Sequence, residues 1–291
     1  MCALSMQAAE AYANYTPSNT TLTFYYDNQR SSRPGTTYDL NGGTSSPGWY
    51  TDGTYEDVTK AVFNSSFADA RPITTFGWFN KMYFLQSITG LEYLNTSEVT
   101  NMNWMFGWCM SLTSLDMSHL NTAKVTDMEG MFYDCMWLVE LNLNSFNTSN
   151  VFDMDQMFAY CTLLTTVSVG DGWSAVAVLT SDRMFEGCTS LVGGQGTTYN
   201  ASHVDKAYAH IDGGPSNPGY FTAAAAAFLR GDVDGNGEVG IADVTALIHY
   251  LLTGDATGVN TAAADCDESG DVGIADVTTL ISYLLTGNWP D

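Results

Sequence analysis

A pattern that returns every 26 or 27 residues constrains the fold of this chain more than any other feature of its sequence. The pattern is Met-Phe-x-x-Cys-x-x-Leu, and its copies begin at Met105, Met131, Met157 and Met184. A repeat of this length is one structural unit that cannot bury its apolar side alone, so neighbouring units stack and share a continuous core. The sequence therefore predicts a solenoid of stacked coils.

Each repeat contains two local patterns. Residues 112–117 alternate between apolar and polar side chains, as a short strand does, and equivalent segments follow in the next two repeats. Val125, Met128 and Met131 stand three residues apart, a spacing that suits a helical or 3₁₀ turn on the opposite side of the coil. We therefore expect one strand and one tight turn per repeat.

The cysteines of the repeat share one position, occupied by Cys109, Cys135, Cys161 and Cys188. Adjacent coils of a parallel stack lie about 5 Å apart, so a disulfide between them is allowed by distance. Because such a bridge would pull neighbouring coils out of register, we expect buried free thiols. We interpret the methionines in the same way, as adaptable core residues and not as a soft-metal site.

The repeat resembles the BspA-type leucine-rich repeat proteins that many anaerobic bacteria carry on their surfaces, and the resemblance covers roughly residues 75–221. A strand-like stretch at residues 22–26 resembles the start of that family's N-terminal cap. The resemblance implies an α/β solenoid of about 26 residues per turn with a β-rich N-terminal cap. It also implies a broad exposed surface that binds a protein or a glycan.

Aromatic residues recur at variable positions of the repeat, where nothing in the core pattern requires them. These residues form a possible ligand surface, because their rings can stack on sugar rings or on protein side chains. In the alternative interpretation, the same rings only pack against the next coil. The candidate residues are Trp104, Trp108, Tyr133, Trp137 and Tyr160.

The composition changes after the repeat, at a run of five alanines from residue 223 to 227. We expect residues 1–13 to be the remnant of a signal peptide, with an ordinary disordered N-terminus as the alternative. The other predicted segments are a β-rich cap at 14–75, the repeat solenoid with its C-terminal cap at 76–221, an Ala-rich linker at 222–228, and an acidic module at 229–291.

The acidic module contains a twelve-residue loop twice, beginning at Asp232 and, 33 residues later, at Asp265. Oxygen-bearing side chains stand at positions 1, 3, 5 and 12, and Gly stands at position 6. Ca²⁺ binds about six to eight oxygens, and a loop that winds around it presents alternate residues inward, with a main-chain carbonyl at position 7. We therefore predict two Ca²⁺ ions, held by Asp232, Asp234, Asn236, Glu238 and Asp243, and by Asp265, Asp267, Ser269, Asp271 and Asp276.

These loops carry Asp at position 12, where an ordinary EF-hand has Glu, and only a short segment precedes the first loop. Together with the duplication and the opening Gly-Asp-Val, this resembles a type I dockerin, a small all-α calcium-binding domain. The resemblance implies calcium-dependent docking to a cohesin domain of a scaffoldin or surface protein. The family's contact positions map onto Ile241, Ala242, Ile248 and His249, and onto Ile274, Ala275, Ile281 and Ser282.

The charge balance excludes several kinds of partner. The formal net charge is −23, so phosphate backbones and anionic lipid headgroups would repel the chain. No apolar stretch approaches the roughly 18 residues of a membrane span. The four histidines have no metal-ligand spacing, and no nucleophile stands with an acid and a base, so we do not expect an enzyme.

The sequence predicts a secreted, non-catalytic protein of the bacterial exterior or cell surface. Its repeats would bind a protein or glycan ligand, as in adhesion, and its dockerin would dock to a cohesin when Ca²⁺ is present. The alternative is a carbohydrate-binding or accessory subunit of a cellulosome-like, polysaccharide-degrading complex.

Overall fold

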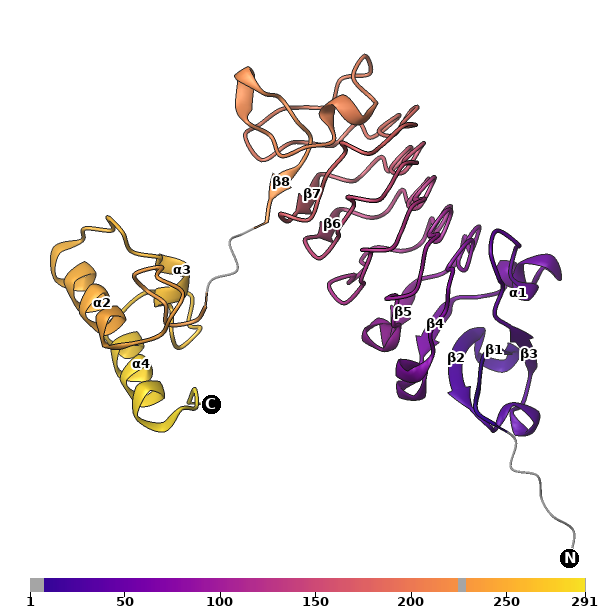
Figure 1. Cartoon of the computed structure of the whole chain (residues 1–291), viewed down its shortest axis with the longest axis horizontal. Helices are drawn as coiled ribbons and strands as arrows, with labels where there is room; N and C mark the ends of the chain where they lie inside the picture. Colours follow the sequence, from indigo (N-terminus) through magenta and orange to yellow (C-terminus); the bar gives the residue numbers. More distant parts are fainter. Residues whose placement is uncertain (1–7, 225–228, 291) are drawn as a thin grey trace, which may run out of the picture. The chain divides into compact units, whose positions relative to one another are not determined.

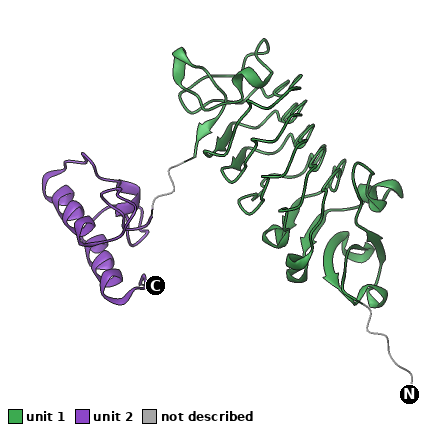
Figure 2. Ribbon diagram, in the orientation of Figure 1, with its two compact units in different colours: residues 1–224 green, residues 225–291 purple. Residues whose placement is uncertain are grey.

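The computed structural model describes residues 8–224 and 229–290 of the chain. These residues fold into two compact units, unit 1 (residues 1–224) and unit 2 (residues 225–291), which Figure 2 colours separately. The fold is mixed α/β, with two small sheets in unit 1 and helices mainly in unit 2. Within the described ranges, no helix has the length and apolar character that a bilayer crossing needs.

Unit 1 begins with a five-stranded sheet in the order β3-β1-β2-β4-β5. β1 pairs with β2 and β3 in antiparallel fashion, whereas β2 with β4 and β4 with β5 are parallel pairs. Phe24 of β2 packs on Trp49 and Trp78 in the core beneath this sheet. The strands are β1 (Glu10–Thr16), β2 (Thr21–Asp27), β3 (Thr36–Asp39), β4 (Lys60–Phe63) and β5 (Ser87–Thr89), with the short helix α1 (Gly48–Thr51) between β3 and β4.

Two predicted boundaries of unit 1 differ from the structure. β1 starts at Glu10, before the boundary that we set at residue 14, because Tyr12 and Ala13 are fully buried and pair with β2. At the other end, the segment that we assigned to a linker from residue 222 begins with β8 (Thr222–Ala223), which pairs with β7. Residues 1–7 and 225–228 lie outside the described residues.

The repeats form stacked coils that follow one another along unit 1 (Figure 1). One residue per coil makes a parallel β-bridge to the next coil, in the series Thr74, Asn101, Asp127, Asp153 and Thr180. The predicted strand forms in two repeats, as β6 (Glu140–Leu143) and β7 (Thr166–Val169). The equivalent segment in the first repeat, residues 112–117, buries Leu112 and Met117 but forms no strand in the described chain.

The Met-Phe segments are turns whose hydrogen bonds alternate between two directions. The N–H groups of Trp104 and Phe106 donate to the carbonyls of Glu129 and Met131 in the next coil, at 2.8 and 2.9 Å. The N–H group of Met105, which lies between them, donates within its own coil to Met102. The predicted tight turn forms, because the N–H groups of Met105 and Gly107 each donate to the carbonyl three residues earlier. No continuous helix or 3₁₀ helix forms at this place in the described residues, because every second N–H group bonds to the neighbouring coil.

This stacking places equivalent side chains in continuous rows. Phe79, Phe106, Phe132, Phe158 and Phe185 form one row of parallel rings, with successive centroids 5.5 to 5.8 Å apart. The four repeat cysteines are buried free thiols, and each Sγ donates to the main-chain carbonyl of the Phe in the preceding coil. Burial raises the pKa of the Cys161 thiol to about 12, so this thiol stays protonated and unreactive at neutral pH.

The C-terminal end of the stack is closed around Asp212, which is 4% exposed. Its carboxylate accepts hydrogen bonds from the N–H groups of Gln195, Thr197 and Gly214 at 2.8, 3.0 and 2.9 Å, and from Oγ1 of Thr197 at 2.7 Å. Burial acts to raise the pKa of Asp212, but these hydrogen bonds outweigh it and hold the pKa well below its usual range.

We predict that Asp212 makes unit 1 sensitive to acid. Because its pKa is lower in the folded than in the unfolded state, its stabilising contribution is complete above about pH 5 and is lost as the pH falls further. Asp212→Asn should lower the stability at pH 7 and reduce the loss between pH 5 and pH 2, measured by urea unfolding across this range. The exposed Asp171→Asn is the control, and equal pH dependence in wild type and Asp212→Asn would contradict the prediction.

Candidate functional site

Unit 2 is built from helices α2 (Ile241–Thr253), α3 (Thr261–Ala264) and α4 (Ile274–Thr286). Val233, Leu247, Cys266 and Leu280 are fully buried in its core, which the two longer helices share. Each predicted loop runs directly into one of these helices, the first into α2 and the second into α4.

The first loop gathers three carboxylates. Asp232, Asp234 and Asp243 each offer an oxygen, and these oxygens all lie within 4.8 Å of one another. Asp243 connects the loop to α2, because its carboxylate accepts from the N–H groups of Asp234 at 3.0 Å and Gly240 at 2.7 Å. Oδ2 of Asp232 accepts from the N–H group of Gly237, but its buried Oδ1 has no hydrogen-bond partner among the described residues.

The second loop repeats this geometry. Asp265, Asp267 and Asp276 offer oxygens within 4.8 Å of one another, and Asp276 accepts from the N–H groups of Asp267 and Gly273. The glycines at position 6, Gly237 and Gly270, have φ angles of +90° and +92°. These angles lie in a region that L side chains rarely adopt, which explains the glycine in both loops.

The remaining predicted ligands lie around these clusters. Oδ1 of Asn236 accepts from the N–H group of Glu238 at 2.8 Å, and Oγ of Ser269 donates to the carbonyl of Asp271 at 3.2 Å. The side chains of Glu238 and Asp271 are exposed and outside the clusters, so these residues are available only through the main-chain carbonyl predicted for position 7.

The residues present fit a calcium ion. Each loop offers three carboxylates in a small space, and such hard oxygen donors are the ligands that Ca²⁺ prefers. The carboxylates would repel one another without a cation, and a cation would also satisfy the unpartnered Oδ1 of Asp232.

Comparison with known families agrees with this geometry. Residues 230–285 match the family model described as "Dockerin type I domain". The C-terminal segment is a type I dockerin domain. Domains of this family bind calcium, and a dockerin implies docking to a cohesin in a cellulosome-like complex.

The repeats of unit 1 match a second family. Residues 77–162 and 115–216 match the model described as "Mycoplasma protein of unknown function, DUF285", a BspA-like repeat. No curated protein and no solved structure matches the chain. Both matched families are typical of extracellular or surface proteins.

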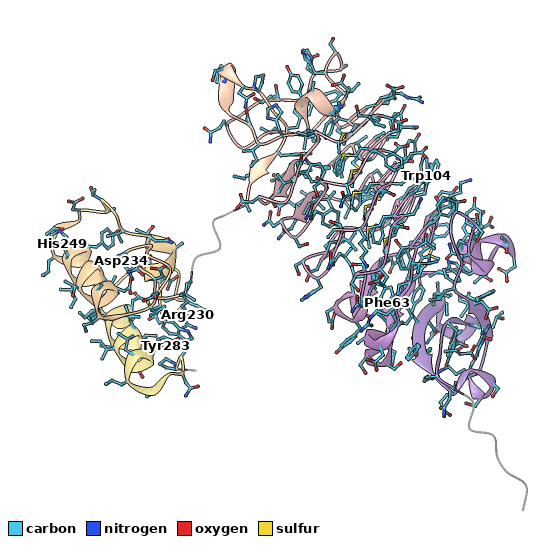
Figure 3. The ribbon with its side chains drawn as sticks, viewed as in Figure 1. Phe63, Trp104, Arg230, Asp234, His249 and Tyr283 are labelled. Atoms are coloured by element: carbon cyan, nitrogen blue, oxygen red, sulfur yellow. The ribbon has the colours of Figure 1, made fainter. Side chains whose placement is uncertain are left out.

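The predicted partner residues of the dockerin lie on α2 and α4, and the equivalent isoleucines match in exposure. Ile241 and Ile274 are 76% and 75% exposed, and Ile248 and Ile281 are both 39% exposed. Ala242, Ala275 and His249 are also exposed, whereas Ser282 is half-buried. Figure 3 shows His249 on α2 and Asp234 in the loop that precedes it.

Two further exposed residues were missed at these helices. Leu252 and Leu285 are 80% and 81% exposed, so each helix carries a further large apolar side chain on its surface. The repeated Leu-Leu pair contained the signal, because consecutive residues lie about 100° apart around a helix, so the two side chains of each pair point in different directions.

The ends of the dockerin meet at Trp289. Its ring stacks on Tyr283 with centroids 4.1 Å apart, and the guanidinium of Arg230 lies 4.4 Å from the ring centroid on Trp289. Figure 3 shows Arg230 and Tyr283 close together in this unit. These contacts join residues near the two ends of the domain and fix Trp289 on Tyr283 of α4.

Four of the five aromatic residues predicted as a ligand surface lie together on unit 1. Trp104 stacks on Trp108 at 4.9 Å, Trp108 contacts Tyr133 at 4.6 Å, and Tyr133 contacts Tyr160 at 5.4 Å between ring centroids. We call these four residues the aromatic strip, and all of them are half-buried. Trp137 is 54% exposed and has no ring contact in the part of the chain that the structure describes.

Three residues of the aromatic strip have a left-handed backbone. The φ angles of Trp104, Trp108 and Tyr160 are +55°, +58° and +63°. The left-handed region costs a residue with a side chain about 1–2 kcal/mol. Gly130 and Gly187 stand at the equivalent positions of other coils and also have a positive φ. Glycine adopts this conformation without the energetic cost that the aromatic residues carry.

Packing against the next coil explains part of this arrangement. The ring of Trp104 covers Gly130, where an added Cβ would lie 2.6 Å from ring atoms. Lys81 lies over Trp108, with its Nζ 5.4 Å from the ring centroid. The aromatic strip therefore packs on the coils and also keeps part of its surface accessible.

We predict that Gly130 is required for the seating of Trp104. Gly130→Ala should destabilise unit 1 by about 1 kcal/mol through its positive φ, and by more through the clash with the Trp104 ring. Gly43 has a similar φ of +59° with nothing within 4 Å of an added Cβ, so Gly43→Ala isolates the first effect. Urea unfolding and tryptophan fluorescence measure the two effects, and equal losses in both variants would show that Trp104 is not seated on Gly130.

Proposed function

We propose that the chain is a secreted, non-catalytic interaction protein of the bacterial exterior. Its dockerin, loaded with two Ca²⁺ ions, docks to a cohesin of a scaffoldin or surface protein. Its repeats form a leucine-rich-repeat solenoid that presents a ligand surface. The observation that supports the docking is the pair of equal carboxylate clusters, each at the start of a helix with exposed apolar residues.

The geometry links calcium to docking through two residues. Asp243 and Asp276 belong to the carboxylate clusters and also accept from the N–H groups of Gly240 and Gly273, directly before α2 and α4. An ion in each loop therefore fixes the first turn of the helix, which carries Ile241 or Ile274. When Ca²⁺ is removed, repulsion between the carboxylates opens the loops and releases both helix starts.

The two halves of the dockerin present equivalent surfaces. Three exposed apolar residues of α2 match their equivalents on α4 to within 1% in exposure, in the pairs Ile241 and Ile274, Ile248 and Ile281, and Leu252 and Leu285. Either half can then contact a cohesin, so the loss of one surface leaves the other available.

We predict calcium-dependent docking that survives the loss of either half. The full chain should bind at least one member of a panel of purified type I cohesins in Ca²⁺ and lose this binding in EDTA. Ile241→Gln or Ile274→Gln alone should retain binding, whereas the double variant should bind at least tenfold more weakly, measured by biolayer interferometry. Leu179→Asp, at an 80% exposed position of unit 1, is the control. Binding that persists in EDTA would contradict this proposal.

A second candidate function is that of a carbohydrate-binding or accessory subunit of a polysaccharide-degrading complex. The aromatic strip favours it, because Trp104 and Trp108 form a stacked, partly exposed pair beside Tyr133. Such a surface suits the faces of sugar rings.

We predict that glycan binding, if it is the function of the repeats, depends on the aromatic strip. On a glycan array, Trp108→Ala and Tyr133→Ala should each reduce the signal about tenfold, since a buried aromatic contact contributes about 1–2 kcal/mol. Trp137→Ala is the matched control, because Trp137 is exposed but outside the strip. Equal signals in all variants, or binding to matrix proteins alone, would favour adhesion to a protein.

A further inference from the structure

Lys81 lies among aromatic rings of unit 1 and has no acidic partner there. Its Nζ is 5.4 Å from the ring centroid of Trp108 and 6.0 Å from that of Tyr50. Among the described residues, Nζ of Lys81 makes no ion pair and no hydrogen bond. The same holds for only one other of the nine lysines and arginines, Lys60, which is exposed, whereas Lys81 is half-buried. Lys81 is therefore a partly desolvated charge with three free donors.

Two tyrosines continue the row of rings beyond Lys81. Tyr50 stacks on Tyr55 with centroids 4.8 Å apart, and both are half-buried. Because Lys81 approaches both Tyr50 and Trp108, it connects this pair to the aromatic strip. Oη of Tyr55 donates to Oε1 of the exposed Glu56 at 3.1 Å, so an acidic side chain stands at this end of the row.

The other end of the row is also acidic. Burial raises the pKa of Tyr133 in the aromatic strip, and the charges of Asp134 and Glu186 raise it further. Arg183 opposes this effect, but it forms an ion pair with Glu186, with Nε and Oε2 3.8 Å apart. A carboxylate on a ligand would therefore be attracted at Lys81 and repelled towards either end of the row.

We propose that the aromatic strip, Lys81 and Tyr50 bind a glycan of neutral sugars that carries an isolated uronic acid. Neutral sugar rings stack on the aromatic side chains, and the uronate carboxylate accepts charge-assisted hydrogen bonds from Nζ of Lys81. The acidic ends of the row and the net charge of −23 disfavour a glycan with a carboxylate on every sugar. This assignment rests on the second candidate function, glycan binding by the repeats, and names its ligand class.

Matched pairs of glycans on an array test the preference for one acidic sugar. Each pair has the same neutral backbone, of xylose, glucose, mannose or galactose units, with or without a single glucuronic acid substituent. The full chain should bind the acidic member of at least one pair about tenfold more tightly, as expected for a hydrogen-bonded charge pair. This preference should shrink as NaCl rises from about 0.05 M to about 0.5 M, because salt screens a partly exposed ion pair.

Three variants connect the preference to one side chain. Lys81→Met keeps an apolar chain beside Trp108 and should bind both members of the pair with the wild-type affinity for the neutral member. Lys81→Arg keeps the positive charge and should retain the preference. Lys60→Met, at an exposed position of the same unit, is the control and should behave as the wild type. Near-ultraviolet circular dichroism reports whether each variant is folded.

The outcomes separate this assignment from glycan binding itself. If the wild type binds both members of every pair equally, or if folded Lys81→Met keeps the preference, the role of Lys81 is wrong although the repeats still bind glycans. If the wild type binds no glycan in either form, the second candidate function is wrong and this assignment with it.

Discussion

The main-chain hydrogen bonds between coils are the interaction on which the rest of unit 1 depends. Every second N–H group of a Met-Phe segment donates to a carbonyl one coil further along, as Trp104 does to Glu129 and Phe106 to Met131. These bonds join main-chain groups and do not depend on side-chain identity. They therefore fix the distance between coils whichever residues occupy the turn. Side chains at equivalent positions must then lie next to one another.

This arrangement stabilises some rows of side chains and strains others. Phenylalanine rings stack in parallel along the core, and each cysteine thiol donates a hydrogen bond to a main-chain carbonyl of the preceding coil. The same spacing brings Asp127 and Asp153 together despite their equal charge. It also puts Trp104 and Trp108 into a left-handed backbone. Residues without an aromatic ring, such as Gln156 and Arg183, have the same left-handed backbone at equivalent positions, so this conformation belongs to the coil and not to the aromatic residues.

The sequence predicted the calcium loops better than it predicted the turns. The candidate ligands of a calcium loop stand at fixed sequence positions, so Asp232, Asp234 and Asp243 could be predicted from the sequence alone. In the structure their carboxylates lie close together. The spacing of Val125 and Met128 suggested a helical turn, because a period of three does not show that alternate N–H groups bond to another coil. The proximity of Asp153 to Asp127 likewise depends on the register between consecutive coils. This register cannot be predicted from the sequence of a single coil.

The dual role of Asp243 and Asp276 gives the dockerin a direct connection between its metal sites and its surface. Each carboxylate holds the loop and the first turn of a helix at once. Neither α2 nor α4 can shift along its axis without moving an oxygen of the corresponding carboxylate cluster. The position of the apolar side chains on the surface therefore follows the position of these two carboxylates, so a displacement of one carboxylate cluster would move the surface of its own half of the domain.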